Sequence, residues 1–449
     1  MSELVNQKDD DREILGWTMY DWANSTFSTT VITALLGPYI TALAGSSETP
    51  LAVLGVRIEP AAIYPFAASL SVFLQVFFLP ILGTIADYTN LKKKMMMVFA
   101  YTGATATIFL VFVQADMPVI GTNGAVLYAS ILAIIANLCF GAAVVFYNAF
   151  LPEIASPENR DMVSSKGFAY GYLGGGLLLL VNLGMLTVME DTGLAVRLSL
   201  ASAGAWWFLF TYIFPQQRLK VRDAAKQMPE GVGYFRHGIR TIRKTLSEMR
   251  SKYPVTLQYL IAYLIYNDGI QTVIIVATLF AATELGVETT SLLLLVLMVQ
   301  FVAFGGAFLF GYLAKRFGAK RAIVLSLFIW SGLVIYAYGF LYTETQLFIM
   351  GAVMAVVLGG SQALSRSLFS QMIPADHEAE YFGFYEVSER GTSWLGPMAF
   401  AAAVQITGSQ RIAIISLIIF FVVGLALLMR VDVEKGIRDA GHNPEGVVL

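Results

Sequence analysis

Long apolar stretches separated by short polar connectors run along almost the whole chain. Most of them reach or exceed the about 20 residues that an α-helix needs to cross the hydrocarbon core of a bilayer. They lack the short apolar–polar alternation of a membrane β-barrel, so the pattern predicts transmembrane helices, whose backbone groups bond internally. We expect twelve spans, at residues 14–43, 61–86, 95–114, 125–149, 165–189, 197–214, 254–282, 289–314, 322–342, 346–366, 382–407 and 411–430.

The basic residues of the connectors are distributed unevenly between the two faces of the predicted membrane domain. One face receives the clusters 92–94 and 315–321, whereas the other receives only Arg57, Arg197 and Arg411. Because Lys and Arg accumulate in cytoplasmic loops, we expect a multi-pass protein of the cell (inner) membrane with both termini in the cytoplasm. The cytoplasmic connectors are then 87–94, 150–164, 215–253, 315–321 and 367–381.

A single long polar connector divides the spans into six and six. It holds ten Lys and Arg residues and an amphipathic stretch near 234–250. This stretch either binds anionic lipid or a partner, or belongs to a solvated linker that fixes topology. The predicted organisation is an N-terminal six-helix half at 1–214, a basic linker at 215–253, a C-terminal half at 254–430 and a tail at 431–449.

Composition excludes several classes of protein. Hydrophobic residues make up 57% of the 449 positions and charged residues 13%, against roughly 25% charged residues in soluble domains. The net charge of −2 gives no reason to expect a nucleic-acid partner, and the single Cys139 and three scattered histidines give no metal site. Without a GxxxxGK[ST] motif or a Ser/His/Asp set in the spans, we expect no nucleotide hydrolysis, no cofactor and no enzyme activity.

Polar residues inside the spans are the candidates for function, because an ionisable group in a membrane span is costly. In the first span, Asp21 and Asn24 are three residues apart and share a helix face. Asp21 either binds a substrate cation or carries a coupling proton. Alternatively, it lies near the cytoplasmic end, where it is partly hydrated and favours a helix N-terminus.

The seventh span places Asn267 and Asp268 about halfway along its length, with Gln271 one turn later. Asp268 is the leading candidate for a proton carrier, ahead of Asp21; the alternative is a structural ion pair or hydrogen bond. Gly269 is expected to loosen the helix and expose backbone carbonyls, as in discontinuous transporter helices.

The tenth and eleventh spans add further polar candidates. Gln362 and Arg366 are four residues apart, so both can face one cavity, where Arg366 would hold a carboxylate. Alternatively, Arg366 anchors the cytoplasmic end of the tenth span. Trp394 lies deeper in the eleventh span and is expected to line the cavity.

Candidate gate residues lie at the start of the eleventh span and the end of the fourth. Glu386 and Arg390 have the favourable i,i+4 order, with Glu389 beside them. They form either a salt bridge that breaks during transport or a static ion pair near the interface. Glu153, after Pro152, suits a gate or a helix-start cap.

The two halves repeat a short motif after their second spans. Residues 83–94 and 311–321 each have Gly, a charge four residues later and a basic cluster. The first copy resembles the motif of the major facilitator superfamily, whose halves are parallel repeats. In that family the Gly permits close helix packing and the Asp caps a helix across the half interface. The resemblance therefore implies a gating role for Gly83, Asp87, Lys92 and Lys93.

Six further motifs, each at the corresponding span, give a narrower resemblance. Together they are similar to the branch of the superfamily related to the fungal vacuolar autophagy-related amino-acid effluxer. The resemblance implies a twelve-helix facilitator that exports amino acids. The motifs are Tyr20–Ser25, Tyr147–Glu153, Gly171–Gly175, Tyr266–Thr272, Gly360–Ser367 and Gly383–Tyr385.

These observations predict an all-α membrane protein with the major facilitator fold, built from two pseudo-symmetric six-helix halves. It would be a secondary active transporter that exports amino acids or similar small polar solutes by alternating access, driven by protons. A monomer embedded in the lipid bilayer suffices, because one chain holds both halves of the pathway. A multidrug or sugar-type exporter, a lipid flippase and a non-transporting membrane sensor are the alternatives.

Overall fold

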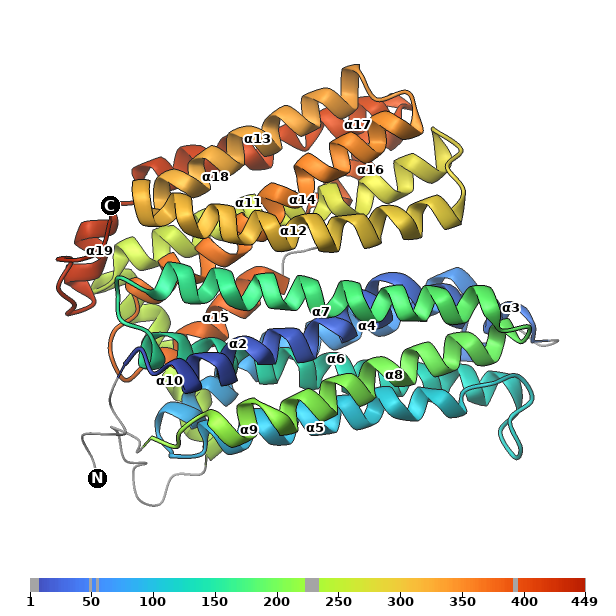
Figure 1. Cartoon of the computed structure of the whole chain (residues 1–449), viewed down its shortest axis with the longest axis horizontal. Coiled ribbons are helices and arrows are strands. Elements are labelled where there is room, and N and C mark those ends of the chain that lie inside the picture. Colours follow the sequence, from blue (N-terminus) through green and yellow to red (C-terminus); the bar gives the residue numbers. More distant parts are fainter. Residues whose placement is uncertain (1–7, 48–50, 54–55, 223–233, 391–394, 449) are drawn as a thin grey trace.

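The computed structural model describes residues 8–47, 51–53, 56–222, 234–390 and 395–448. Nearly all of them lie in helices that run roughly along the long axis of the molecule, in two groups (Figure 1). We call α2 to α9 the N-terminal group and α11 to α18 the C-terminal group. A two-residue antiparallel hairpin, β1 (Ala52–Val53) with β2 (Val56–Arg57), follows the first span.

The N-terminal group begins with one long irregular helix. Its segments α2 (Asp11–Thr26) and α3 (Leu36–Gly45) flank a π-helical stretch, η1 (Phe27–Leu35). The remaining elements are α4 (Pro60–Asp87), α5 (Lys92–Ile108) with the 3₁₀ turn η2 (Phe109–Phe112), α6 (Gly121–Ile154), α7 (Arg160–Val188), α8 (Thr192–Ile213) and α9 (Pro215–Arg218).

The C-terminal group follows the linker helix α10 (Tyr234–Ser251). Its elements are α11 (Pro254–Thr283), α12 (Thr289–Phe317), α13 (Ala319–Gly339), α14 (Glu344–Gln371), α15 (Glu378–Arg390), α16 (Leu395–Thr407), α17 (Gln410–Ser416) and α18 (Ile418–Arg430). The last described helix is α19 (Val433–Asp439).

The prediction of an all-α membrane protein is confirmed. Within the described residues, eleven helical stretches are long and apolar enough to cross a membrane. They match the predicted spans except the eleventh, 382–407, where two shorter helices, α15 and α16, flank residues 391–394. The count of twelve spans is thus approximate, because the predicted eleventh span includes residues that lie outside the described part of the chain.

The expected loosening of the seventh span at Gly269 is wrong. Helix α11 is continuous from Pro254 to Thr283. A Cβ atom at position 269 would lie 2.8 Å from the Cβ of Phe420, so this glycine lets α18 approach α11 closely. The irregular backbone is instead in the first span, where η1 interrupts the α-helix, and such π-helical turns are frequent at functional sites.

The two groups meet mainly along α7 and α15. Helix α7 packs against α12 and α14, and α15 of the C-terminal group packs against α4 and α6. The first turn of α2 and the C-terminal helix α19 lie at the same end of the molecule, on the left in Figure 1. We call this the termini end, and the other the opposite end.

The linker helix α10 packs against α4 and α11 at the termini end. Met249 is fully buried, and the Thr245 hydroxyl donates a hydrogen bond to the Glu380 carboxylate in the first turn of α15. His377 Nδ1 lies 3.0 Å from the other oxygen of that carboxylate. The amphipathic part of the linker is therefore attached to both groups.

Candidate functional site

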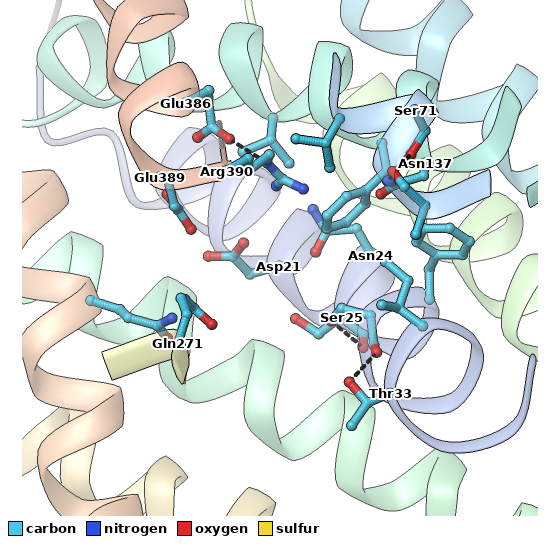
Figure 2. Close-up of a pocket in the computed structure, with 18 of the residues that line it drawn as sticks. Asp21, Asn24, Ser25, Thr33, Ser71, Asn137, Gln271, Glu386, Glu389 and Arg390 are labelled. Carbon is cyan, nitrogen blue, oxygen red and sulfur yellow. Dashed lines mark hydrogen bonds and ion pairs between the residues drawn. The ribbon is translucent and has the colours of Figure 1, made fainter. Parts of the chain in front are cut away.

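A cavity of about 460 Å³ lies between the two groups of helices (Figure 2). Asp21 and Arg366 line its inner part, and Leu36 and Tyr64 line the part nearest the opposite end. Asp21 and Leu36 are separated by about 20 Å of helix, because each residue of a helix rises 1.5 Å. The cavity therefore extends from the interior of the bundle toward the opposite end.

The cavity brings together polar side chains that are far apart in the sequence. They come from the first span, α4, α6, α7, α11, α14 and α15. The site residues expected from the sequence that line it are Asp21, Asn24, Gln271, Gln362, Arg366, Glu386, Glu389 and Arg390.

Asp21 is buried and forms an ion pair between the two groups. Its Oδ2 atom lies 3.3 Å from Nη1 of Arg366, and it accepts a hydrogen bond of 2.6 Å from the Tyr147 hydroxyl. The expected i,i+3 neighbour Asn24 faces the same cavity. The alternative of a hydrated Asp21 at the membrane surface does not fit this burial.

Arg366 extends from α14 into a socket made by the N-terminal group. Its Nε and Nη2 atoms donate to the hydroxyl and the carbonyl of Ser164, each at 3.0 Å. The rings of Trp17 and Phe168 lie 4.8 and 4.3 Å from the guanidinium carbon, in cation–π geometry. The side chain is 3% exposed, so Arg366 joins the two groups in the interior and is no surface anchor.

A second ion pair lies beside the first. Glu386 is fully buried and pairs with Arg390 at 2.9 Å, as the i,i+4 spacing predicted. Asn148 connects the two pairs: its amide nitrogen donates to Glu386 at 2.7 Å, and its carbonyl oxygen accepts from Arg366 at 3.3 Å. Charged side chains of α2, α14 and α15 and the Asn148 amide of α6 thus form one hydrogen-bonded network.

The remaining predicted site residues lie behind the cavity or outside the described chain. Asn267 donates to the backbone carbonyl of Glu389 at 3.2 Å. Asp268 is 1% exposed and packs beside Gly396, without an ion pair in the part of the chain described here. Neither residue lines the cavity, whereas Gln271 does. Trp394 lies outside the described residues.

Sequence analysis missed the hydroxyl groups at the end of α2 and in the π-helical stretch η1. Ser25, Ser28 and Thr33 line the cavity, and the Thr33 hydroxyl donates to the Ser28 carbonyl at 2.9 Å (Figure 2). The available signal was the cluster of hydroxyl residues at 25–30 within an apolar span. Tyr147, Ser164 and Phe168 were missed as Arg366 partners, because sequence does not reveal which helix faces meet across the groups.

Close contacts between the groups seal the termini end. Both carboxylate oxygens of Asp87 accept backbone N–H groups at the start of α15, from Ala379 at 3.0 Å and from Glu380 at 2.8 Å. A Cβ atom at Gly83 would lie 2.2 Å from the Ala379 carbonyl oxygen. The packing and capping contacts that the resemblance implied are therefore present; their role as a gate stays a prediction.

The basic residues after α4 take part in a polar network at the same end. Lys92 forms an ion pair with Glu153, and Lys93 donates to the Leu219 carbonyl at 2.6 Å. Arg222 pairs with Glu13 at 2.8 Å and lies 3.7 Å from Glu153. This network attaches the start of the linker to the N-terminal group.

A further seal was not predicted. Arg160, at the start of α7, is 3% exposed and donates to the Ser370 carbonyl at 2.9 Å and to the Gln371 side chain at 3.1 Å. Gln371 in turn donates to the Pro157 carbonyl at 2.8 Å. The loop between α6 and α7 is thereby held against the end of α14.

A sequence model of the family described as "Vacuole effluxer Atg22 like" matches residues 9–441. The chain belongs to this Atg22-like family. Bacillus subtilis has a relative, named as an uncharacterized MFS-type transporter, YxiO, that is 32% identical over 93% of this chain and 94% of its own. Autophagy-related protein 22-1 of Penicillium rubens is 26% identical over 96% of this chain and 91% of its own.

Solved structures show that this Atg22-like chain has the major facilitator fold, as predicted. The human organic anion transporter MFSD10 matches with a TM-score of 0.66 and 15% identity, over 94% of this chain and all of that one. The proton:xylose symporter XylE matches with a TM-score of 0.63 and 14% identity, over 96% and 97% of the two chains. The chain is thus a multi-pass membrane protein with the fold of major facilitator transporters.

Proposed function

We propose that the chain exports amino acids or similar small polar solutes across the cell membrane by alternating access. The observation that carries this proposal is the cavity between the two groups, which contains both carboxylates and guanidiniums. The ammonium group of a zwitterion can pair with the carboxylates of the cavity. Its carboxylate can pair with the guanidiniums, and arginine can make this pairing bidentate. The family's description as vacuole effluxers supports export.

The proposed orientation places the termini end in the cytoplasm. The basic clusters 92–94 and 315–321 adjoin this end, and such residues favour the cytoplasmic side. The contacts of Asp87 and Arg160 close it, whereas the cavity extends the other way. The structure then corresponds to an outward-open state, from which a bound solute leaves the cell.

The return to the inward-open state requires separation of the termini end. The bonds from Asp87 to α15 and from Arg160 to α14 must break while contacts at the opposite end form. We propose that residues 1–214 and 254–430 rock as two units around the cavity, joined by the linker 215–253. Asp268 and Asp21 are the proposed proton carriers, because both are buried carboxylates in the membrane interior.

Transport by purified protein in proteoliposomes tests the proposal. We expect efflux of at least one radiolabelled amino acid, accelerated by a pH gradient and reduced more than tenfold by Arg366→Ala. Arg411→Ala is the matched control, since Arg411 lies at the opposite end, where it donates to the Leu341 carbonyl at 2.7 Å. Transport of sugars or apolar cations without any amino acid would contradict the assignment.

Asp268→Asn separates proton coupling from transport. We expect this variant to lose gradient-driven efflux and to retain exchange of the solute between the two sides. Unchanged gradient-driven efflux would remove Asp268 from the proton pathway and leave Asp21 as the candidate.

A further inference from the structure

A second cavity lies at the termini end of the C-terminal group, and we call it the lateral cavity. Its volume is about 570 Å³, within the range of sites that bind small molecules. The start of α13, the end of α18 and the segment 431–434 form most of its wall, and α7, α14 and residues 447–448 complete it. It shares no described lining residue with the cavity between the two groups, so it is a separate feature of the molecule.

Three basic side chains line the lateral cavity, Lys320 and Arg321 of α13 and Arg430 of α18. The Lys320 ammonium donates to two backbone carbonyl oxygens near the end of α18, at 3.0 and 2.8 Å, so it is held against the wall. Arg321 is exposed, and its guanidinium has one long hydrogen bond, of 3.4 Å, to the Phe317 carbonyl. Arg430 is exposed and makes no hydrogen bond or ion pair within the described residues. Two guanidiniums are therefore available to an anion.

The acidic side chains that line the lateral cavity already have partners of their own. Asp161 accepts a hydrogen bond from the Ser367 hydroxyl. Asp432 caps the first turn of α19, where it accepts a backbone N–H group at 3.0 Å. Glu434 forms an ion pair with Arg438 one turn later on α19. None of these three contacts involves the guanidinium of Arg321 or of Arg430.

The chain segments around the lateral cavity are basic overall. Residues 315–321 and 430–438 contain seven Lys and Arg residues against two Asp and Glu residues. The carboxylate that α7 adds, of Asp161, directly follows the basic Arg160 in the chain. Clefts in which one sign of charge predominates attract ligands of the opposite sign. The ligand that fits this cavity is therefore an anion.

The two available guanidiniums lie at the ends of lipid-facing surfaces. Arg321, Leu325 and Phe328 share one face of α13, because they are four and three residues apart. Leu325 and Phe328 are 46% and 58% exposed. Met429, which directly precedes Arg430 at the end of α18, is 61% exposed. Both helices belong to candidate membrane spans and pack side by side (Figure 1), so their exposed apolar faces contact acyl chains.

We propose that the lateral cavity binds the headgroup phosphate of an anionic phospholipid. Arg321 and Arg430 hold the phosphate, because a guanidinium pairs bidentately with phosphate oxygens and basic pockets at the ends of membrane helices bind such headgroups. The acyl chains lie along the exposed faces of α13 and α18. Free phosphate would meet the same guanidiniums but would leave these apolar faces unused. In the proposed orientation the lipid belongs to the cytoplasmic leaflet, and its binding does not depend on which solute is transported.

Native mass spectrometry of the full-length protein in detergent tests the proposal with three probes. Dioleoyl phosphatidylglycerol has an anionic headgroup and two chains, dioleoyl phosphatidylcholine has the same chains and a zwitterionic headgroup, and glycerol 3-phosphate has a phosphate without chains. We expect phosphatidylglycerol to bind with a Kd about tenfold lower than either of the others. Equal binding of the two lipids would overturn the proposal. Glycerol 3-phosphate that binds as tightly as phosphatidylglycerol would also overturn it and would indicate a site for soluble phosphates.

Two double variants of matched charge locate the binding. Arg321→Gln with Arg430→Gln removes both available guanidiniums from the lateral cavity. Lys315→Gln with Arg316→Gln removes two charges from the same basic connector, at the end of α12, where neither residue lines the cavity. All four side chains are exposed, so we expect both variants to fold, which the unfolding temperature without lipid checks. The first should bind phosphatidylglycerol about tenfold more weakly, and the second should bind it as the unmodified protein does.

The outcomes distinguish a built site from a general attraction of acidic lipid to basic residues. Equal weakening in both double variants would show general attraction and overturn the proposal, as would unchanged binding in the first. If the first double variant does not fold, Arg430→Gln alone gives the same test, with a Kd about threefold higher. The measurement is of lipid binding, so its failure would leave amino-acid export standing, and a failure of amino-acid transport would leave the lipid site standing.

Discussion

At the scale of single residues, Arg366 connects the two groups of helices. It is a C-terminal-group side chain whose hydrogen-bonding and ring partners, among them Asp21, Ser164 and Phe168, lie in the N-terminal group. A buried guanidinium is tolerated only when its donors are satisfied and its charge is paired. The socket therefore fixes how the two groups lie against each other at the inner end of the cavity.

Removing this guanidinium should destabilise the fold. Arg366→Gln leaves Asp21 buried without its counter-charge, which costs about 3–5 kcal/mol in soluble proteins. We expect a lower unfolding temperature in detergent and a partial recovery in the double variant Arg366→Gln with Asp21→Asn. Destabilisation of the double variant by the full sum of the two single effects would show that the pair is not coupled.

At the scale of helices, we propose that the contact between α4 and α15 controls whether the termini end is closed. Asp87 caps the first turn of α15, where the partial positive charge of the helix N-terminus favours a carboxylate. Gly83 lets the two backbones touch, because any side chain there would meet the Ala379 carbonyl. Capping and close packing act on the same turn of α15.

A methyl group at Gly83 should open the termini end. Gly83→Ala places a Cβ within 2.2 Å of a backbone oxygen that cannot move alone, so α4 and α15 must separate. In a Cys139→Ser background, a cysteine at Ser370, which is buried between the groups, should then react faster with a hydrophilic thiol reagent. Gly305→Ala is the matched control, since a Cβ there meets nothing within 4 Å. Equal labelling in both variants would show that this contact does not hold the end closed.

The linker helix α10 should be held in place by one buried hydrogen bond. Thr245→Val removes the hydroxyl that bonds to Glu380 and leaves its shape, which costs about 1–2 kcal/mol when a buried acceptor loses a donor. We expect about tenfold faster amide hydrogen exchange in α10. Ser247 is exposed on the same helix, so Ser247→Ala should leave the exchange rate in α10 unchanged. An unchanged exchange rate in Thr245→Val would show that this hydrogen bond does not hold α10 in place.

At the scale of the whole molecule, the charges of the connectors predict its orientation. The basic clusters and the last described helix share one end, so the proposed topology places both termini in the cytoplasm. A fluorescent protein fused to the C-terminus should fluoresce, and alkaline phosphatase at the same site should be inactive. The reverse result would also reverse the proposed outward-open assignment.

Hydropathy and charge in the sequence determined that the chain is a bundle of membrane helices, because the bilayer imposes length and polarity on each span locally. Short-range spacing also determined the Glu386–Arg390 pair and, by resemblance, the contacts of Gly83 and Asp87. Only the tertiary structure decided that Arg366 pairs with Asp21 and that Asn148 joins the two ion pairs. It also placed Asp268 behind the cavity and found the irregular backbone in η1 rather than at Gly269. These features depend on which helix faces meet between the groups, and that is a long-range packing property that no local pattern in one sequence encodes.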